Sequence, residues 1–181
     1  MSYPVFVLPR DKIWLAASGA LVLAAAAAYF AAVPPVGAAI EGKPAPPLVL
    51  ADLSGQTASL AEYRGKIVLL DFWATWCVTC LEELPELKRL YSALAPRGFE
   101  LLAPSVDEEG RKALLPFVAK HGVPWRVLLA DRPSLRLYPV FGLPTKYLID
   151  REGIVSRKYI GPVPVSSIEN DVQSLLQRRS S

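Results

Sequence analysis

The sequence predicts an α/β domain whose mixed central sheet is flanked by helices, preceded by one transmembrane helix. Apolar runs of strand length alternate with amphipathic helical stretches, and the pattern ends in a strand hairpin and a last helix. A separate run of uncharged residues lies near the N-terminus. The chain has 181 residues, which fits one domain of ordinary size plus such an appendage.

The N-terminal segment 13–33 contains no charged side chain. As a helix it would extend over about 31 Å, enough to cross the hydrocarbon core of a bilayer. Arg10 and Lys12 precede it and the first charge after it is Glu41, so the N-terminus is expected in the cytoplasm and the domain outside. A cleaved signal peptide is the alternative, because Val36-Gly37-Ala38-Ala39 offers small residues to a peptidase. Its apolar stretch would be shorter, about 7–15 residues, which favours the anchor.

These features divide the chain into four parts. We expect a cytoplasmic N-terminus over 1–12, an anchor over 13–33, a linker rich in Pro, Gly and Ala over 34–47, and the folded domain over 48–181. The expected location is the inner membrane, crossed once, with the domain facing the periplasm.

The domain is expected to open with a hairpin and a buried strand. Ser54-Gly55 separates Leu48–Leu53 from Thr57–Leu60, which is typical of a hairpin turn. Lys66–Trp73 is a continuous apolar run with one acid in it, as in a strand covered on both faces.

A helix, a strand and a second helix follow. From Cys77 to about Ala95, leucines recur at spacings of three and four, which predicts a helix that Pro85 should kink. Phe99–Val106 is a second buried strand, and Glu109–His121 is a helix that should end at Gly122.

Three strands and a helix complete the domain. Trp125–Ala130 is the next strand, and Thr145–Asp150 with Ile154–Ile160 forms a second hairpin around Arg151-Glu152-Gly153. Ser166–Gln177 closes the chain as a helix.

Charge and cysteine content exclude several classes of protein. The net charge of +3 comes from 20 basic and 17 acidic residues without a basic stripe, which argues against a nucleic-acid partner. Two cysteines are too few for a disulfide-stabilised scaffold. A zinc site would need two further soft ligands, but His121 is the only histidine and fits a helix C-terminal residue better. No metal and no bound cofactor is therefore expected, and each cysteine has the other as its obvious partner.

The chemistry is expected at Cys77-Val78-Thr79-Cys80. A strand ends near Trp73 and a helix starts near Cys77, so the first sulfur lies at a helix N-terminus, where free amides and the helix dipole favour a thiolate. Cys80, one turn later, can close a disulfide after Cys77 attacks a partner. A purely structural disulfide is the alternative, but such a short loop would contribute little to stability.

The segment DFWATWCVTCLEELPEL resembles the active-site segment of the thioredoxin superfamily. Pro85 matches the family's helix-kinking proline, and Gly142-Leu143-Pro144-Thr145 resembles the segment whose cis proline faces the cysteine pair. Leu148-Ile149-Asp150 followed by Gly153 continues that pattern. The anchored arrangement is similar to the TlpA/ResA/CcmG branch. The resemblance extends from Gly42 to the C-terminus and implies a thioredoxin-like fold.

The resemblance also implies roles for individual residues. Trp76 matches the tryptophan that shapes the substrate-docking surface, the alternative being a plain core aromatic. Asp71 matches a buried acid beneath the resolving sulfur, where it could accept the proton of Cys80; it could also be an acid satisfied at a strand end. A cis Pro144 would hold Leu143 so that its backbone pairs with an extended substrate strand, the alternative being an ordinary trans turn proline.

Two further positions, Glu83 and Thr79, differ from these in how they match the family. Glu83 matches a glutamate frequent in this branch, and a solvated charge on the helix face is equally consistent. Thr79 departs from the family, which usually has proline directly before the second cysteine, and CVTC-like pairs resemble the end domain of transmembrane disulfide reductases. Unlike proline, Thr79 keeps an N–H that could donate to the Cys77 thiolate and make the pair more oxidising. Thr79 is accordingly a candidate for tuning the pair as well as for docking substrate.

The function implied is an extracytoplasmic thiol:disulfide oxidoreductase. It would reduce disulfides of exported apoproteins, in cytochrome c maturation or copper-site assembly, and receive electrons from a membrane donor of the transmembrane disulfide-reductase type. An oxidant that introduces disulfides would use the same residues. A Sco-like copper chaperone would need a wider CxxxC pair and a distal histidine. A peroxidase is suggested by GKPAPPLVLADLSGQ, which is similar to peroxiredoxin-like domain starts, but the PxxxTxxC pattern is absent.

Overall fold

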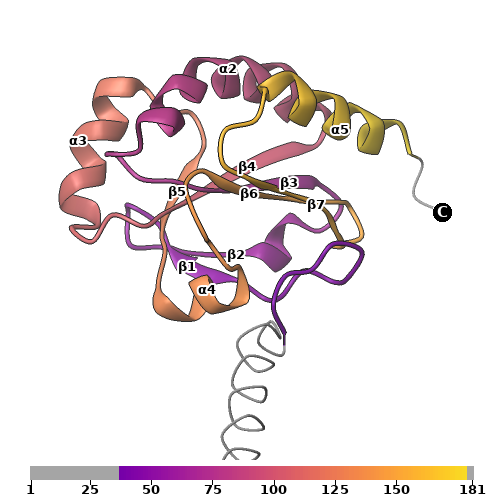
Figure 1. The fold of residues 1–181 in the computed structure, drawn as a ribbon, viewed down its shortest axis with the longest axis horizontal. Helices are drawn as coiled ribbons and strands as arrows, with labels where there is room; N and C mark the ends of the chain where they lie inside the picture. The colour runs from indigo at the N-terminus through magenta and orange to yellow at the C-terminus, as the bar shows by residue number, and fades with distance from the viewer. Residues whose placement is uncertain (1–36, 179–181) are drawn as a thin grey trace, which may run out of the picture. The chain divides into compact units, whose positions relative to one another are not determined.

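The computed structural model describes residues 37–178, and these form a three-layer α/β domain around a five-stranded sheet (Figure 1). The strands lie in the order β5 (Arg126–Leu129), β4 (Phe99–Ser105), β3 (Ile67–Phe72), β6 (Thr145–Ile149) and β7 (Val155–Ile160). The pairs β3–β4 and β4–β5 are parallel, whereas β3–β6 and β6–β7 are antiparallel. The predicted mixed sheet is confirmed.

Different elements cover the two faces of the sheet. The helices α2 (Val78–Leu94), α3 (Arg111–His121) and α5 (Val165–Gln177) pack on one face. The small hairpin of β1 (Val49–Ala51) and β2 (Thr57–Ser59), together with the short helix α4 (Arg132–Leu137), lies on the other (Figure 1). The central strands are therefore buried on both sides, which explains why they are almost continuously apolar.

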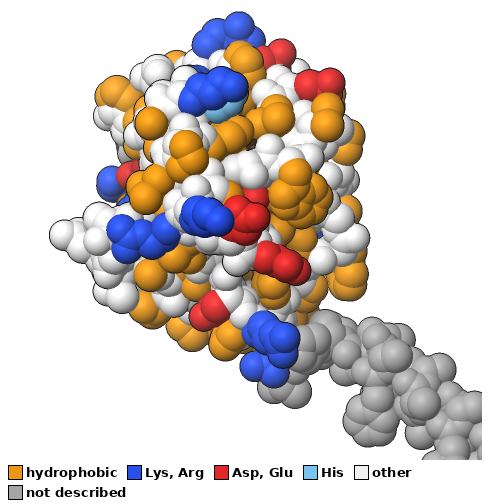
Figure 2. Space-filling view, turned by 90° about the vertical axis from the view of Figure 1, so that its left-hand side faces the viewer, with side chains coloured by type: hydrophobic (Ala, Val, Ile, Leu, Met, Phe, Trp, Pro, Cys, Tyr) orange, Lys and Arg blue, Asp and Glu red, His pale blue; other side chains and the backbone are white. Residues whose placement is uncertain are grey.

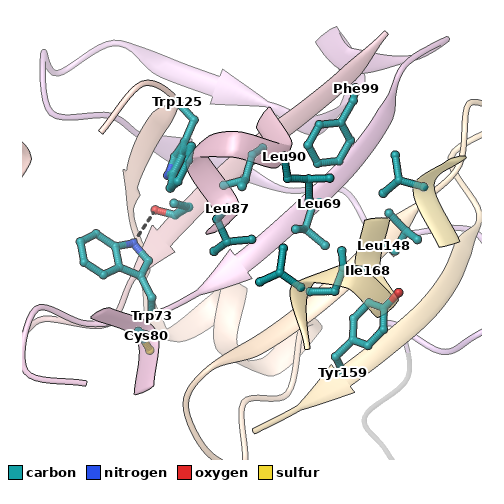
Figure 3. Close-up of a cluster of buried hydrophobic side chains, with 14 of the residues drawn as sticks. Leu69, Trp73, Cys80, Leu87, Leu90, Phe99, Trp125, Leu148, Tyr159 and Ile168 are labelled. Atoms are coloured by element: carbon teal, nitrogen blue, oxygen red, sulfur yellow. Dashed lines mark hydrogen bonds between the residues drawn. The ribbon is translucent and has the colours of Figure 1, made fainter. Parts of the chain in front are cut away.

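The alternation of side chains along β3 feeds two separate hydrophobic clusters. Ile67 and Leu69 pack with leucines of α2 and with Ile168 of α5, and Figure 3 shows this larger cluster. Val68, Leu70 and Phe72 belong to the cluster on the hairpin side. The alternation places Asp71 on the helix side, under α2, where the cysteines are.

Two separate short helices were not predicted, and a short 3₁₀ helix, Ala95–Arg97, follows α2 directly at its predicted end. Leu60, assigned above to a strand, instead begins the 3₁₀ helix Leu60–Tyr63, where Ser59 and Glu62 form a reciprocal capping box. Asp131 and Ser134 form the same kind of cap at α4. Both helices are too short for helical periodicity to be recognised, although each is preceded by a capping residue.

The described part of the predicted linker packs on the domain. Ala38 and Ala39 are buried, the Ala39 amide donates to the Leu137 carbonyl over 2.7 Å, and Pro44 bridges to Ile154. Residues from Gly37 onward thus form one compact unit with the domain. The anchor predicted over 13–33 lies outside the described residues. Within 37–178, no helix is both long and apolar enough to cross a membrane.

Candidate active site

Cys77 and Cys80 lie where the central strand passes into the first long helix. β3 ends at Phe72, a short loop follows, and Cys77 is the N-cap residue of α2. The two sulfurs form a disulfide, and Cys77 Sγ also accepts a hydrogen bond from the Cys80 amide over 3.2 Å. The first sulfur therefore lies at the N-terminus of a 17-residue helix, as the spacing predicted.

The loop that carries Cys77 is fastened to the end of the neighbouring strand by Asp107. Its carboxylate accepts hydrogen bonds from the Thr75 amide over 2.9 Å and the Thr75 hydroxyl over 2.6 Å, and from the Ser105 hydroxyl over 2.6 Å. β3 and β4 are parallel, so their carboxyl ends meet at one edge of the sheet. Sequence reasoning missed Asp107, although the polar Ser105 and Asp107 at the carboxyl end of a buried strand were a usable signal.

Exposure separates Trp76 from the cysteines that follow it. Trp76 is 66% exposed, whereas Cys77 and Cys80 are 6% and 8% exposed. Trp76 is thus a surface residue and not a core aromatic. In this disulfide form, exposure does not distinguish the two cysteines. On the left-hand side of the molecule as drawn in Figure 1, apolar side chains are interspersed with small acidic and basic groups (Figure 2).

Thr79 contacts the cysteine pair through its hydroxyl. Thr79 Oγ1 lies 3.5 Å from Cys77 Sγ, while the amide that donates to this sulfur belongs to Cys80. The expectation that the Thr79 amide would be the donor is therefore corrected. At the second position of the helix the side chain turns back over the N-cap, and the amide one residue later points at the sulfur.

The segment around Pro144 lies beside the active-site loop. The Leu143–Pro144 peptide bond is cis. β6 starts at Thr145, which pairs with Phe72 at the end of β3, so Pro144 is brought next to the start of the Trp73–Cys77 loop. Leu143 packs against the cluster that contains both cysteines, and the Thr145 hydroxyl donates to the Gly142 carbonyl over 2.6 Å. The trans alternative for Pro144 is wrong.

Asp71 belongs to a buried triad of charged side chains. Lys146, its register partner on β6, places Nζ 3.5 Å from Asp71 Oδ1 and 2.5 Å from Glu83 Oε2 on α2. The lysine is 1% exposed, and the side chains of Asp71 and Glu83 are 7% and 10% exposed. The Glu83 side chain is therefore largely buried, and the solvated-charge interpretation is wrong.

Comparison with known proteins identifies the family. The AhpC/TSA family profile matches residues 41–158. The chain belongs to this family. The thiol-disulfide oxidoreductase ResA of Geobacillus kaustophilus is 37% identical over 136 residues, which cover 74% of this chain and 77% of that protein. ResA of Bacillus subtilis is 37% identical over 138 residues, 76% of each chain.

Solved structures agree with this assignment. A thiol:disulfide interchange protein of the thioredoxin family from Chlorobium tepidum superposes with a TM-score of 0.69 at 27% identity, over 77% of this chain and 99% of that one. The solution structure of a thiol:disulfide interchange protein from Bacteroides sp. gives a TM-score of 0.67 at 26% identity, over 77% and 92%. The chain is a thioredoxin-like thiol–disulfide oxidoreductase, and enzymes of this type use a redox-active disulfide instead of a cofactor.

Burial controls the ionisation of the triad in this oxidoreductase. Burial raises the pKa of the Asp71 carboxyl above its ordinary value, and the nearby Lys146 ammonium partly offsets that rise. Burial raises the pKa of Glu83 in the same way, again opposed by Lys146, and the neighbouring Asp71 raises it further. Within the described residues, Asp71 Oδ1 is a buried oxygen without a hydrogen-bond donor.

Asp71 and Cys80 line the same small cavity. Its volume is about 20 Å³, and the indoles of Trp73 and Trp125 form part of its wall. Figure 3 shows Cys80 beside Trp73, whose indole N–H donates to the Ala103 carbonyl over 3.3 Å. Apart from the Asp71 carboxyl, the cavity is lined mainly by apolar and aromatic side chains. Cys80 is thus largely buried and lines the same cavity as the Asp71 carboxyl.

Sequence reasoning missed Lys146 at this site. The signal was a single cation inside the apolar strand Thr145–Ile149, matching the single acid inside Ile67–Phe72. Both residues are charged positions in strands buried along their whole length. Such positions are almost always paired, so each predicts the other.

Proposed function

We propose that the chain is an extracytoplasmic reductant of protein disulfides, with Cys77 as the attacking nucleophile and Cys80 as the resolving thiol. The proposal rests mainly on the position of Cys77 Sγ in the fold. It lies at the N-terminus of α2, where it accepts the Cys80 amide, while Cys80 faces the cavity that Asp71 also lines. A sulfur that receives a backbone N–H at a helix N-terminus is favoured as a thiolate, which is the attacking species.

The proposed exchange proceeds in two balanced steps. The Cys77 thiolate attacks one sulfur of a substrate disulfide, forming a mixed disulfide and releasing the other substrate sulfur as a thiolate. Cys80 then loses its proton to Asp71 and attacks Cys77 Sγ, which releases the second substrate sulfur and forms the Cys77–Cys80 disulfide. Two electrons pass from the dithiol to the substrate; the Cys80 proton passes to Asp71 and then to solvent, and the two released substrate thiolates take their protons from solvent.

The substrate is proposed to bind across Trp76, Thr79, Leu143 and Pro144. The exposed indole of Trp76 offers apolar contact area beside the disulfide. The backbone of Leu143, just before the start of β6, offers hydrogen-bonding groups to an extended segment. Exported apoproteins of cytochrome c maturation or copper-site assembly are the substrates we propose.

The setting of this chemistry is proposed from the N-terminal sequence. Segment 13–33 would anchor the protein in the inner membrane with the domain in the periplasm, and a membrane donor of the transmembrane disulfide-reductase type would return electrons to the disulfide. Support comes from the uncharged length of 13–33 and from the basic residues that precede it.

Two measurements on the full-length protein test this proposal. Replacing the resolving thiol, Cys80→Ala, should trap mixed disulfides through Cys77, while the matched variant Cys77→Ala should trap few. Trapping mainly in Cys77→Ala would reverse the two roles. Redox equilibration with glutathione should give a potential in the range of reductants such as thioredoxin, about −270 mV.

The alternatives give different outcomes in the same experiments. A potential near about −120 mV, as in strong disulfide-introducing oxidants, would assign the protein as an oxidant with the same residues. Stoichiometric copper binding by the reduced protein, without any exchange activity, would assign it to the copper chaperones.

A further inference from the structure

Lys146 is a buried cation that the cysteine chemistry described so far leaves without a role. It lies two residues after the cis proline, in the strand that starts beside the active-site loop. The side chain is 1% exposed, and its ammonium contacts one carboxylate from β3 and one from α2. A buried ammonium is costly unless it is paired, so its place between two acids determines the charge of the whole site.

The charge of this triad changes by one unit with one proton. With both carboxylates ionised, Asp71, Glu83 and Lys146 carry a net charge of −1, and with one carboxyl protonated they are neutral. Burial favours the neutral state. The triad can therefore bind and release one proton. One of its members, Asp71, lines the cavity that Cys80 also lines.

Other neighbours of the triad do not supply a second cation. Glu83 Oε1 accepts the Val163 amide over 3.3 Å, which fixes this carboxylate to the loop before α5. From β7, the register partner of Lys146 is Tyr159, whose hydroxyl donates to Asp171 over 2.7 Å and not to the triad. Among the described residues, each of the two acids therefore has two charged neighbours at most: Lys146 and the other acid.

We propose that Lys146 is a positioning residue of the exchange reaction: its buried ammonium holds Asp71 and Glu83 together beside Cys80 and keeps them able to take the proton of the resolving thiol near neutral pH. The inference rests on the proposed function, because it assumes that Cys80 must be deprotonated. In the second step the proton passes from Cys80 to the triad, the Cys80 thiolate attacks Cys77 Sγ, and the triad later releases the proton to solvent. No other oxidant or reductant is needed.

The test replaces the cation by an apolar side chain of similar length, Lys146→Met, in the full-length protein. The cation lowers the pKa of both acids, so its loss should raise them and reduce the ionised fraction at a given pH. The rate of disulfide exchange with oxidised glutathione should fall about tenfold or more at pH 7 and recover toward the wild-type rate as the pH rises. A uniform loss at every pH would show that Lys146 is structural and would overturn the proposal.

Two further variants make the result specific. Lys146→Arg keeps the charge and should keep the pH profile of the wild type. Lys158→Met is the matched control, because this half-buried lysine on the adjacent strand donates to the Pro139 carbonyl and does not contact the triad. Its profile should be unchanged. If the pH profile of exchange in Lys158→Met were displaced as well, removal of a lysine outside the triad would produce the same effect. That result would also overturn the proposal.

Stability of the oxidised protein provides a readout that does not depend on activity. Acids whose pKa is raised by folding hold their protons more tightly in the folded state, so stability falls as the pH rises above the unfolded-state pKa. In Lys146→Met this fall between pH 5 and pH 9, measured by urea unfolding, should be steeper than in the wild type. In Asp71→Asn it should be shallower, because one of the two acids is gone. An equal pH dependence in all three proteins would refute the coupling.

The outcomes separate this inference from the proposed function. If the wild type does not catalyse exchange, the proposed function fails, while the stability profiles still test the coupling. If the wild type is active and the Lys146→Met profile is not displaced, only the role of Lys146 fails. If Lys146→Met does not fold, the double variant Lys146→Met/Glu83→Gln can replace it, because Asp71 is then the only ionisable group of the triad. The pH profile of exchange in this double variant should be displaced to higher pH than the profile of Glu83→Gln.

Discussion

Thr79 occupies the position directly before the second cysteine, where the thioredoxin-like sequences that this chain resembles usually have proline, and its hydroxyl lies close to the Cys77 sulfur. Thr79 Oγ1 is 3.5 Å from Cys77 Sγ, which already accepts the Cys80 amide. In the reduced enzyme the hydroxyl can donate to the thiolate, so it would stabilise the dithiol form relative to the disulfide. A threonine at this position should therefore make the pair more oxidising than a side chain without a donor.

Thr79→Val, which removes the hydroxyl and keeps the shape, should lower the reduction potential. A hydrogen bond to a charged group contributes about 1.5–3 kcal/mol, which corresponds to at most about 30–60 mV for two electrons. Equilibration with glutathione measures the change, and Thr79→Ser, which keeps the hydroxyl, is the control. A potential in Thr79→Val equal to that of the wild type would mean that the hydroxyl is not a donor to the thiolate.

Some residues of the site could be predicted from the sequence and others could not, and the difference has a physical reason. Cys77, Cys80 and Asp71 stand out because a reactive pair at a strand–helix junction and an acid in an apolar strand are visible in one dimension. Lys146 and the burial of Glu83 depend on the register of β3 with β6 and on which side of α2 faces the sheet. Those are properties of the assembled fold, and strand spacing alone does not set them.

At the scale of elements, the active-site loop depends on β4 as much as on α2. Asp107, just after β4, receives the Thr75 amide and hydroxyl and the Ser105 hydroxyl. The two bonds from Thr75 hold the loop before Cys77 against the end of the parallel pair β3–β4, and the bond from Ser105 orients the Asp107 carboxylate. The position of Cys77 is therefore fixed by the sheet as well as by the helix.

Asp107→Ala should both destabilise the domain and slow exchange. Loss of hydrogen bonds to a carboxylate is expected to lower the free energy of unfolding by about 1–3 kcal/mol, as measured in urea. The loop before Cys77 would also lose its attachment, so the exchange rate should fall in the remaining folded protein. Glu108→Ala, at the exposed neighbour, is the matched control and should change neither quantity. An Asp107→Ala protein that is less stable but exchanges at the wild-type rate would restrict Asp107 to a role in folding.

The long elements could be predicted because each buries a continuous or periodic apolar surface, whereas α4 could not. Its six residues are held mainly by the Asp131–Ser134 cap and by contacts of its apolar residues with the hairpin-side cluster. A helix this short has little propensity to form by itself, so tertiary contacts decide whether it exists. The second face of the sheet is closed by α4 and by the β1–β2 hairpin; the sequence pattern predicted the hairpin but not α4.

At the scale of the whole molecule, residues 37–47 belong to the fold. The amides of Ala39, Gly42 and Ala45 donate to carbonyls of the domain, and the Lys43 carbonyl accepts the Val155 amide. A fragment that starts at Gly37 should therefore fold and exchange disulfides. One that starts at Leu48 should be less stable by about 2–6 kcal/mol, the sum expected for these four bonds. Equal urea midpoints for the two fragments would show that the segment adds nothing.

The packing of Ala38 and Ala39 also bears on whether the N-terminal segment is retained. The small residues that a signal peptidase would recognise, Val36-Gly37-Ala38-Ala39, include two buried alanines, and Ala39 donates to the Leu137 carbonyl at the end of α4. Cleavage after Ala39 would remove that contact from the mature domain. The length of the apolar segment 13–33 and the packing of Ala38 and Ala39 on the domain both favour retention of the N-terminal segment. Membrane fractions should contain protein of full-length mass that resists extraction with carbonate. A soluble product that begins at Ala39 or Ile40 would exclude the anchor and leave export of the domain intact.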